Sequence, residues 1–505
     1  QGFDEPVAIH GVERYLGDLI LEQPLPDHFS PWRTERIAVV GSGPAGLACA
    51  YHLNRLGYGV TVFESDTQAG GMLRQGIPGY RLPRTVLDRQ IQWFEAQGIE
   101  IRCEQGIGDR VDWESLSDFA AVFLATGAHL SRAAGMVDEQ GPGVRPGLEF
   151  LRDVNRGQIP ILGLRVAVIG GGNTAMDCAR TARRLGSEVT VVYRRTRTEM
   201  PAIAAEIEEA EREGVAFRFL AAPRAALRED GVLTGIACTP MELGPPDESG
   251  RRRPVPSETE QEFVLEVDSV LTAIGETTDL GFLPDPLKPR WGTFEVGPLN
   301  AITGEAADPD SDRDAAPGPT VVFAGGDVAE QPRTVAHALG AGKRAALGID
   351  RALHVARGKA IEDWDPEGFT FGPEGNVSIT QYRRDDPIRR EDPLNEVVEA
   401  EDLNPEHFQK VPRHSDWHLP PDDALEDFTE ANRGLLPDQA LEEAGRCFNC
   451  GVCNGCELCL IYCPDFAISR RADGGFTIDM DYCKGCGICA EECPRGAIVM
   501  TQEGV

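Results

Sequence analysis

The chain has 505 residues, 41% of them hydrophobic, which is enough to build several domain cores and too many for a disordered chain. It carries 49 Lys and Arg against 82 Asp and Glu, a net charge of −33 that argues against sequence-independent nucleic-acid binding and against docking on anionic lipid. No apolar run is long enough to span a bilayer, and the start lacks a signal peptide, so we expect a soluble protein.

The sequence predicts five regions in chain order. Residue 1 is Gln rather than Met, which indicates a processed or truncated product. Weak periodicity and prolines predict an arm lying on the first domain at the N-terminus, and the Gly- and Pro-rich, acidic stretch 304–319 predicts a loop. The regions are an arm at 1–32, a discontinuous α/β domain at 33–160 and 280–370, a second α/β domain at 161–279, an extended linker at 371–440 and a cysteine-rich domain at 441–505.

The first nucleotide site begins where an apolar strand at 36–40 runs into a glycine-rich turn and a helix. The turn fits G-x-G-x-x-G, which lets a pyrophosphate approach the backbone at a helix N-terminus. A second strand at 60–63 ends in a carboxylate 23 residues past the first glycine, the position that accepts hydrogen bonds from a ribose diol. The predicted FAD-binding residues here are Gly41, Gly43, Pro44, Ala45, Gly46 and Glu64.

Two later strand-and-turn segments, at 124–127 and 323–327, are predicted to complete the same site, with a helix from about Thr334 to His354 following the second. Because these segments are far apart in the chain, the FAD domain is expected to be discontinuous. His337 is interpreted as a packed or surface histidine rather than a base. The residues assigned to FAD here are Thr126, Gly127, Gly326, Asp327 and Thr334.

The same strand–turn–helix–strand order returns at 164–192, where the turn fits G-x-G-x-x-A. The position equivalent to Glu64 holds Tyr193, followed by two arginines, which would attract a 2′-phosphate and so favour NADPH over NADH. Arginine also stacks on adenine, and both side chains could instead be solvated. The predicted NAD(P)H-binding residues are Gly170, Gly172, Asn173, Thr174, Ala175, Tyr193, Arg194, Arg195, Ala273, Ile274 and Gly275.

Ten of the 14 cysteines fall between 447 and 493, which indicates metal ligation in a reducing, cytoplasmic compartment rather than a disulfide scaffold. Two runs obey C-x2-C-x2-C-x3-C-P, the pattern of two [4Fe–4S] clusters in which the fourth cysteine of each run ligates the other cluster. Zinc is the weaker alternative, and Cys447 and Cys450 are surplus, either structural thiols or ligands of a further cluster. The predicted ligands are Cys453, Cys456, Cys459 and Cys493 for cluster 1, and Cys483, Cys486, Cys489 and Cys463 for cluster 2.

Several motifs together resemble the glutamate synthase small-subunit family and the FAD/NADPH half of dihydropyrimidine dehydrogenase. They are the two glycine turns, the segment from Gly70 to Pro83, Tyr193 to Pro201 and Phe323 to Asp327. The resemblance covers roughly 6–350 and implies an α/β fold with two Rossmann-like domains arranged as in glutathione reductase, plus a small α+β ferredoxin-like domain. It also implies that Gly70, Gly71, Leu73, Gly76, Ile77 and Arg81 lie along the flavin.

Two departures from that family matter. Its members begin with a cysteine-rich domain, and Glu443 to Cys447 looks like a motif that belongs with that domain. The appended ferredoxin-like region is similar to stand-alone NAD(P)H:acceptor oxidoreductases of the family, including those serving dissimilatory sulfite reductase. Glutamate synthesis itself is therefore not implied.

The sequence thus predicts an FAD- and NAD(P)H-dependent iron–sulfur oxidoreductase that exchanges single electrons with a protein partner, a ferredoxin or a catalytic reductase subunit. No redox cysteine pair precedes Cys447, so disulfide reduction is disfavoured. No acid–base residue is assigned, because hydride transfer needs none. Two alternatives remain: an electron-transfer subunit without a substrate of its own, and a glutamate synthase small subunit proper.

Overall fold

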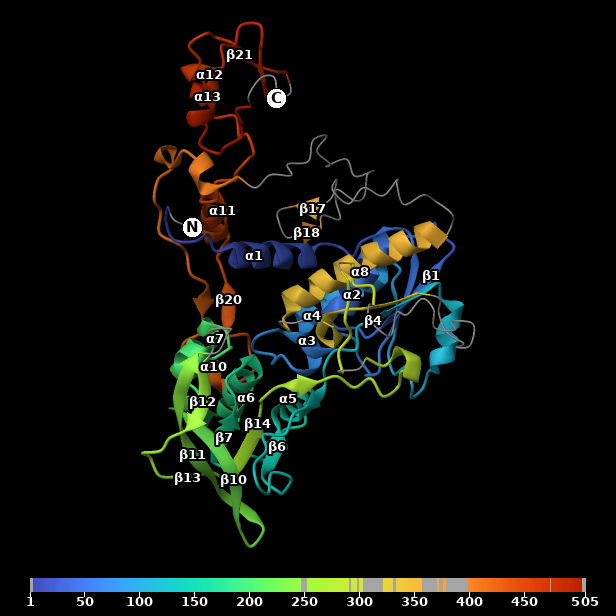
Figure 1. Cartoon of the computed structure of the whole chain (residues 1–505), viewed down its shortest axis with the longest axis vertical. Coiled ribbons are helices and arrows are strands. Elements are labelled where there is room, and N and C mark those ends of the chain that lie inside the picture. Colours follow the sequence, from blue (N-terminus) through green and yellow to red (C-terminus); the bar gives the residue numbers. More distant parts are fainter. Residues whose placement is uncertain are drawn as a thin grey trace. The chain divides into compact units, whose positions relative to one another are not determined.

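The computed structural model describes residues 3–246, 252–289, 292–297, 299–302, 321–329, 333–356, 370–371, 376–377, 398–472 and 474–501. The chain divides into two compact units (Figure 1). The nucleotide unit comprises 24–359 and 418–432, and the C-terminal unit comprises 1–23, 360–417 and 433–505. The loop expected at 304–319 lies outside the described residues, as does much of the expected linker before 398.

The first sheet of the nucleotide unit has five parallel strands in the order β16-β4-β1-β2-β3. Its central strands are short runs of Val, Ile, Ala and Phe that are buried on both faces, as parallel strands covered by helices must be. Helices α2 and α8 pack closely together, since a Cβ on Gly342 would stand 2.2 Å from the Ala45 carbonyl oxygen. The elements are β1 Arg36–Val40, α2 Pro44–Arg55, β2 Gly59–Phe63, α3 Met72–Gln75, α4 Arg84–Ala96, β3 Glu100–Arg102, the 3-10 segment Trp113–Asp118, β4 Ala121–Leu124, β16 Val322–Ala324, the 3-10 segment Gly326–Val328 and α8 Val335–Ala356.

The second sheet is also five-stranded and parallel, in the order β6-β14-β7-β8-β9. Its elements are β6 Val144–Pro146, α5 Gly147–Asn155, β7 Arg165–Ile169, α6 Asn173–Arg184, β8 Glu188–Tyr193, the 3-10 segment Arg197–Glu199, α7 Ala204–Arg212, β9 Ala216–Phe219 and β14 Ser269–Thr272. The two Rossmann-like sheets confirm the predicted fold class. The predicted boundary at 160 differs, because β6 and α5 already belong to the second sheet and its core.

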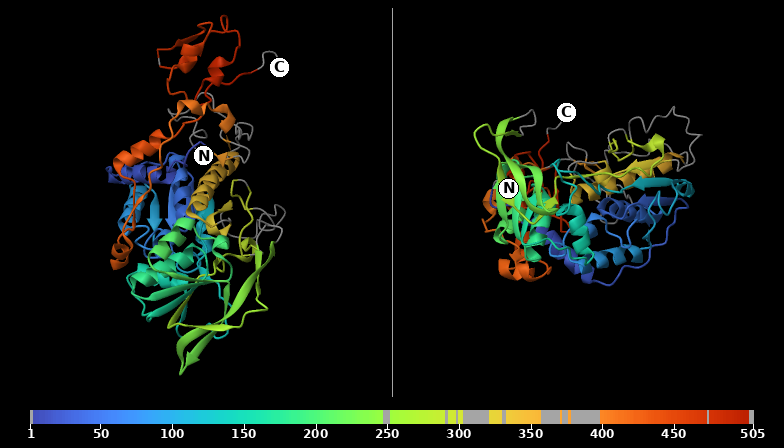
Figure 2. Two further views of the ribbon diagram at one scale, coloured as in Figure 1. Left: turned by 90° about the vertical axis from the view of Figure 1, so that its left-hand side faces the viewer. Right: turned by 90° about the horizontal axis from the view of Figure 1, so that it is seen from below.

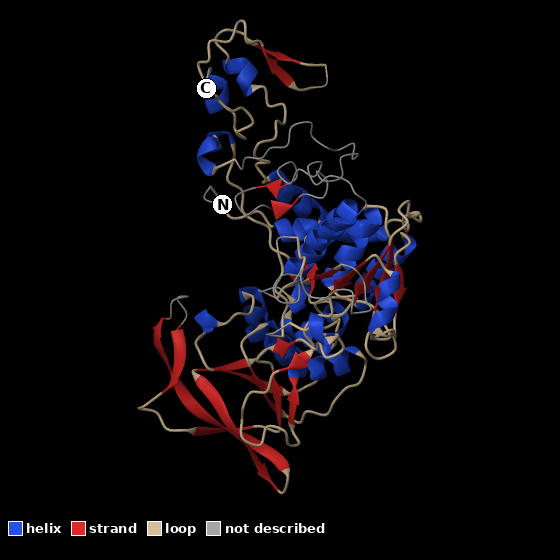
Figure 3. Cartoon of the chain, turned by 45° about the vertical axis from the view of Figure 1, so that its right-hand side comes forward, coloured by secondary structure: helices blue, strands red, loops and turns tan. Residues whose placement is uncertain are grey.

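An antiparallel sheet lies between β9 and β14 in the chain and shows clearly as long arrows in Figure 3. Strand β11 is central, pairing with β10, β12 and β13. The elements are β10 Ala221–Glu229, β11 Val232–Pro246, β12 Arg252–Pro256 and β13 Phe263–Glu266. A separate ribbon pairs β5 Leu130–Ser131 with β15 Glu276–Thr277, and a 3-10 segment follows at Asp285–Leu287.

The described part of the expected linker is structured. It contains 3-10 segments Ala400–Asp402 and Pro405–His407, strand β19 Trp417–His418, helix α10 Pro421–Glu426 and strand β20 Asn432–Gly434. Residues 418–432 belong to the nucleotide unit. The sequence misses this because single buried residues, such as Ala424, Ala431 and Leu435, anchor the segment without forming a periodic pattern.

The C-terminal unit combines the start of the chain with its end. Within the expected N-terminal arm, residues 9–22 form helix α1, which packs against α11. Ala8, Val12 and Tyr15 stand at helical spacing and share a core with Leu435 and Ala440. The elements are α1 Ile9–Glu22, β17 Thr370–Phe371, β18 Asn376–Val377, α11 Pro437–Gly445, α12 Leu458–Tyr462, β21 Ile468–Arg470, β22 Phe476–Ile478 and α13 Ile488–Glu491 (Figure 2).

Among the described residues, no helix combines the length and the apolar composition needed to cross a bilayer.

Candidate functional site

The first glycine turn forms a tight cradle at the N-terminus of α2. Gly41 has φ 104°, and a Cβ there would stand 2.4 Å from the Ala125 carbonyl oxygen. A Cβ on Gly46 would stand 1.9 Å from the Gly41 carbonyl oxygen, so the helix can approach the strand only with glycine here. Around Gly43, in contrast, no described residue apart from its two chain neighbours has an atom within 4 Å of the Cβ position. The turn is therefore closed toward the protein and open on the side where a pyrophosphate would approach.

Glu64 follows β2 directly and is buried. Its carboxylate accepts hydrogen bonds from the backbone N–H and the hydroxyl of Ser42, and from the Asp66 N–H at 2.8 Å. The Ser42 hydroxyl in turn accepts from Gly70 N–H at 2.9 Å. The predicted ribose acceptor thus also fixes the glycine turn against the 70–76 segment.

The 70–77 segment lies against this turn. Gly71 has φ 51°, and a Cβ there would stand 2.8 Å from the Gly43 Cα. Leu73 lies in α3 and packs with the buried cluster that contains Leu47 and Leu87, whereas Gly76 is the C-cap residue of α3. The Ile77 carbonyl accepts from Arg84 at 2.6 Å, which anchors the end of the segment.

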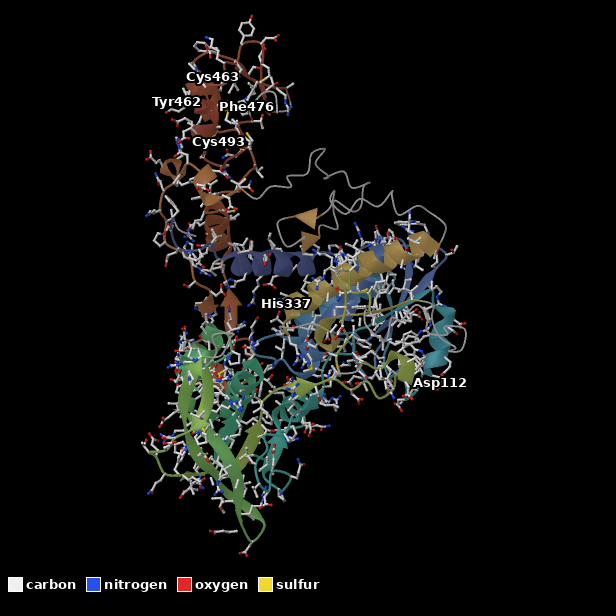
Figure 4. The ribbon with its side chains drawn as sticks, in the orientation of Figure 1. Asp112, His337, Tyr462, Cys463, Phe476 and Cys493 are labelled. Carbon is white, nitrogen blue, oxygen red and sulfur yellow. The ribbon has the colours of Figure 1, made fainter. Side chains whose placement is uncertain are left out.

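The remaining predicted FAD residues that are described follow strands β4 and β16 of the first sheet. The Thr126 hydroxyl is buried without a hydrogen-bond partner, an orphan polar group that a bound ligand would satisfy. Gly326 has φ 72° and approaches Ala45 at the start of α2, with Asp327 directly after it. Thr334 accepts from the His337 N–H and so caps α8 (His337 is labelled in Figure 4). Glu64, Gly70, Gly71 and Gly326 therefore lie against the first glycine turn or the start of α2, and the assignment of these residues to FAD stays a prediction.

The second glycine turn repeats this geometry at α6. A Cβ on Gly170, with φ 144°, would stand 2.2 Å from the Ala273 carbonyl oxygen, and the space around Gly172 is open. Asn173 accepts from Ile203 N–H at 3.0 Å, and Thr174 donates to Glu276 at 3.4 Å. Burial raises the pKa of the Glu276 carboxyl beside this turn.

The predicted 2′-phosphate residues follow β8. The Tyr193 hydroxyl donates to the Glu199 carbonyl at 2.8 Å, and its ring packs against Gly171, so Tyr193 supports the turn. Arg194 is exposed. Arg195 is half-buried, and its Nε has no hydrogen-bond partner in the described structure. Of the last three predicted residues, Ala273 is buried, Ile274 is exposed, and Gly275 has φ 119° and accepts from Arg132.

Arg81 connects the flavin-side segment to the second nucleotide domain. Its guanidinium donates to both carboxylate oxygens of Asp177 on α6, at 2.8 and 3.0 Å, and pairs with Glu206 on α7 at 3.0 Å. Burial raises the pKa of Asp177 to about 6, although Arg81 acts in the opposite direction. Arg81 was predicted to lie along the flavin, and in the structure its charged group is committed to this ion-pair cluster.

A buried network lies behind that contact. Arg180 and Arg184 both bind Glu213, at 2.7 to 3.0 Å, and all three side chains are almost fully buried. The Arg184 guanidinium stacks on the Tyr80 ring at 3.7 Å, and the Tyr80 carbonyl accepts from Ala431 N–H at 2.9 Å. Segment 418–432 therefore joins both nucleotide-binding domains at their shared boundary.

The cysteine-rich region brings the predicted ligands together. Burial raises the pKa of the Cys459 thiol, and the neighbouring thiolates of Cys456, Cys453 and Cys493 raise it further. These are the four residues that the spacing predicts for cluster 1. The pKa of Cys489 is raised in the same way by burial and by Cys486 and Cys483.

The fourth cysteine of each run accepts a backbone hydrogen bond at sulfur. Ala467 N–H donates to Cys463 Sγ at 3.3 Å, and Ala497 N–H donates to Cys493 Sγ at 3.2 Å, contacts that suit charged thiolates. Among the described residues, no three metal-binding side chains converge on a single-ion site.

The surplus cysteines lie elsewhere. Cys447 and Cys450 are both exposed, and Cys447 lines a cavity of about 480 Å³ together with Val7, Asn449 and Arg495.

Glu443 and Arg446 are structural residues that the sequence reasoning did not assign. The buried Glu443 carboxylate accepts from Ala8 N–H at 2.8 Å and from His414 N–H at 2.7 Å, and it pairs with Arg446 at 3.0 Å. Burial raises the pKa of this carboxyl, but these hydrogen bonds outweigh burial and lower it. Both residues stand in the motif before Cys447, which was the only signal in the sequence. The partners of Glu443, His414 and Ala8, lie about 30 and more than 400 residues away, so the motif could not identify them.

Comparison with known proteins agrees with this geometry. Residues 35–342 match the family described as pyridine nucleotide-disulphide oxidoreductase, and residues 476–499 match a 4Fe-4S binding domain. The FprA structure from Mycobacterium tuberculosis in complex with NADPH superposes with a TM-score of 0.53 at 19% identity, covering 65% of this chain and 86% of that one. This likeness concerns the fold alone.

Three curated relatives extend the match. NADP(+)-dependent formate dehydrogenase subunit beta of Moorella thermoacetica is 38% identical over 88% of this chain and 62% of its own. NADPH-Fe(3+) oxidoreductase subunit beta of Geobacter sulfurreducens (strain DL-1 / KN400) is 37% identical over 83% and 62%. The glutamate synthase [NADPH] small chain of Escherichia coli is 34% identical over 69% and 75%. The chain thus spans about three fifths of the length of the first two.

Proposed function

The chain belongs to the pyridine nucleotide-disulphide oxidoreductase family, and on that premise we propose that it is an iron–sulfur flavoprotein that exchanges electrons between NAD(P)H and a protein partner. When bound, FAD would accept a hydride from the nicotinamide, and two [4Fe–4S] clusters would pass electrons singly to or from the partner. The residues of this chain bind, orient and separate these groups.

The observation that carries the proposal is the Arg81–Asp177 ion pair. Arg81 follows the segment that crosses the first glycine turn, and Asp177 lies one turn into the helix that starts at the second. This direct bond between the two nucleotide sites supports hydride transfer between them, because transfer needs both rings held at a fixed separation. The cysteine sets around Cys459 and Cys489 support an onward path for single electrons.

We further propose that both clusters are [4Fe–4S] and that NADPH is the preferred nucleotide. The matched 4Fe-4S domain covers the second cysteine run, and the gathering of Cys493 with Cys453 and Cys456 supports a second cluster. Arg195 offers an unpartnered, half-buried Nε after β8, and the position of the ribose-binding acid is taken by Tyr193. An arginine pair there suits a 2′-phosphate.

The test is anaerobic reduction of the reconstituted chain by NADPH and, separately, by NADH, followed by absorbance and low-temperature EPR. We expect NADPH to bleach the flavin and to produce a reduced [4Fe–4S] signal. Bleaching without cluster reduction would point to electron flow from the partner to the nucleotide. Absence of bleaching by either nucleotide would leave the electron-transfer subunit as the function, and glutamine-dependent NADPH oxidation with a large-subunit partner would identify a glutamate synthase.

The double variant Arg194→Ala/Arg195→Ala tests the nucleotide preference. We expect the KM for NADPH to rise about tenfold or more, because the charge-assisted contacts to the 2′-phosphate are lost, while the KM for NADH changes little. Arg197→Ala is the matched control, since Arg197 follows on the same loop but pairs with Glu211. An equal rise for both nucleotides would contradict a 2′-phosphate role.

A further inference from the structure

The ferredoxin-like part of the C-terminal unit exposes large apolar side chains beside the cysteines predicted for cluster 2. Phe466 is 88% exposed, Tyr482 68% and Met480 66%, and Ile461 and Tyr462 on α12 are exposed as well. Isolated exposed apolar residues are ordinary on protein surfaces, but a contiguous group is not.

Backbone and side-chain bonds join the two turns that carry this group. Asp479 N–H donates to the Ala467 carbonyl at 2.7 Å, which brings Met480 beside the turn of Phe466. Lys484 pairs with Asp465 at 2.8 Å and links the same two turns from their other ends. The five apolar residues therefore lie on two turns and one helix end that are tied together, and we call this group the apolar patch.

The apolar patch lies beside cysteines predicted for cluster 2 rather than beside those predicted for cluster 1. Cys463 directly follows Tyr462, and Cys483 directly follows Tyr482, with its N–H bonded to the Asp479 carbonyl at 2.9 Å. Figure 4 shows Tyr462 and Cys463 at the end of α12, away from α11, whereas Cys493 lies nearer to α11. Near cluster 1, Phe448 stacks on Phe408 at 3.8 Å, so that side is covered by the chain itself.

The backbone at Phe466 adds a second observation. Phe466 has φ 53°, a left-handed conformation that is uncommon for a bulky side chain and costs conformational energy. The turn therefore holds an aromatic ring in solvent at an energetic cost, although a small polar residue would be favoured there. Backbone strain of this kind is typical of positions whose side chain serves a function other than fold stability.

The charges around the apolar patch define its partner. Asp479 and Asp481 flank Met480, and the only cation on these two turns, Lys484, is already paired with Asp465. The turns 463–467 and 479–484 thus carry three carboxylates and one ammonium, on a chain whose net charge is −33. An apolar centre with an acidic rim is complementary to an apolar centre with a basic rim.

We infer that the apolar patch is the docking surface for the electron-transfer partner, a protein that presents an apolar centre ringed by lysine or arginine. The inference rests on the proposed function, because it assigns cluster 2 as the point where electrons leave or enter the chain. Docking here would bring the partner's redox group next to Cys463 and Cys483 and would exclude water from the contact. The aromatic rings supply binding energy and the carboxylates supply orientation and association rate.

The experiment uses the full reconstituted chain and oxidised cytochrome c as the probe, a small carrier whose exposed haem edge is ringed by lysines. Binding is measured by calorimetry without NADPH, and electron transfer is measured as NADPH-dependent reduction. The patch variant is Phe466→Asn/Met480→Thr/Tyr482→Ser, with Asn at 466 because it tolerates positive φ. The matched control is Ile161→Ser, which removes a fully exposed apolar side chain from the nucleotide unit.

We expect the patch variant to bind cytochrome c about tenfold more weakly and to lose about tenfold in kcat/KM for its reduction, with ferricyanide reduction unchanged. Asp481→Lys is expected to weaken binding and to flatten its dependence on ionic strength. The control variant should match the wild type in every assay.

Unchanged binding and reduction of cytochrome c by the patch variant would overturn the inference. So would a wild-type dimer that the patch variant converts to a monomer, since the patch would then be a contact between two copies of this chain. Failure of the proposed function looks different: NADPH would then reduce neither ferricyanide nor cytochrome c, whereas the calorimetric comparison of the variants would still report on docking.

Discussion

At the scale of single residues, the second and third glycines of the first turn, Gly43 and Gly46, differ in what a methyl group would meet. A Cβ on Gly46 collides with the Gly41 carbonyl at 1.9 Å, whereas a Cβ on Gly43 meets no described residue other than its two chain neighbours. Gly43 also has φ −68°, which alanine adopts freely. Gly46 is therefore needed for the fold, whereas the missing side chain of Gly43 leaves room for a ligand.

We therefore expect Gly43→Ala to change the free energy of unfolding of the apoprotein by no more than about 0.5 kcal/mol, but to weaken FAD binding by about tenfold. Gly46→Ala should cost about 3 kcal/mol because the helix must move away from the strand. Urea denaturation of the apoprotein and FAD titration by fluorescence measure the two effects. Normal FAD affinity in Gly43→Ala would place the pyrophosphate elsewhere.

Residues with local signals could be predicted, and residues whose role depends on distant partners could not. The glycines and cysteines occur at fixed short spacings that a turn or a cluster requires, so their positions follow from the sequence. Arg81 stands in a recognisable motif, but its partners Asp177 and Glu206 lie about 100 residues away, on two other helices. No local pattern distinguishes such an arginine from one that contacts a cofactor.

At the scale of elements, the ion pair between Arg81 and helices α6 and α7 fixes the boundary between the nucleotide domains. We expect Arg81→Ala to slow flavin reduction by NADPH about 10- to 100-fold, because small displacements strongly reduce transfer rates. FAD content should stay normal, and Arg81→Lys should restore part of the rate. Arg110→Ala, an exposed arginine of the same domain, is the control in stopped-flow absorbance. Loss of FAD in Arg81→Ala would instead indicate a direct flavin contact.

The buried carboxylate of Glu443 has a comparable role between α1, α11 and the segment around His414. Its folded-state pKa lies below the usual value of 4.5, so its stabilisation is present above that pH and is lost as the pH falls through the folded-state pKa. We expect Glu443→Gln to destabilise the C-terminal unit by about 3 kcal/mol at pH 7, because the buried Arg446 loses its partner at 3.0 Å and keeps only Asp4 at 3.8 Å.

The difference between Glu443→Gln and the wild type should shrink as the pH falls through the folded-state pKa of Glu443, which lies below 4.5, since the wild-type carboxyl is then protonated as well. Glu442→Gln is the matched control, because Glu442 is the exposed neighbour and its carboxylate pairs with His414 at the surface. Chemical denaturation followed by circular dichroism at both pH values measures the effect. A pH-independent difference would exclude the charge as its cause.

Element boundaries were less predictable than element types. Strand β6 has three residues and helix α5 has nine, so their pattern fits either neighbouring domain, and only pairing with β14 assigns them to the second sheet. The described part of the expected linker likewise holds short elements with one buried residue each. Hydrophobic periodicity cannot reveal elements of this length.

At the scale of the whole molecule, the cysteine sets can be removed without disturbing the nucleotide unit. We expect Cys463→Ser to lose about half of the iron and most reduction of a protein acceptor, while NADPH still bleaches the flavin. Cys447→Ser, which replaces an exposed cysteine outside both predicted ligand sets, should keep the iron and the activity. Iron analysis and EPR measure cluster content. Equal iron loss in Cys447→Ser would make Cys447 a ligand.

The contacts of residues 4–8 with residues 411–443 set an order of events during synthesis. Val411 N–H bonds to Asp4 across 407 positions and Ala8 N–H bonds to Glu443 across 435, so helix α1 leaves the ribosome long before its partners exist. At roughly 5–20 residues per second, it waits about 20–80 s with its apolar stripe uncovered. The nucleotide sheets can close during that wait. Completion of the C-terminal unit, and with it any loading of iron and sulfide, therefore has to follow synthesis of the cysteine-rich region.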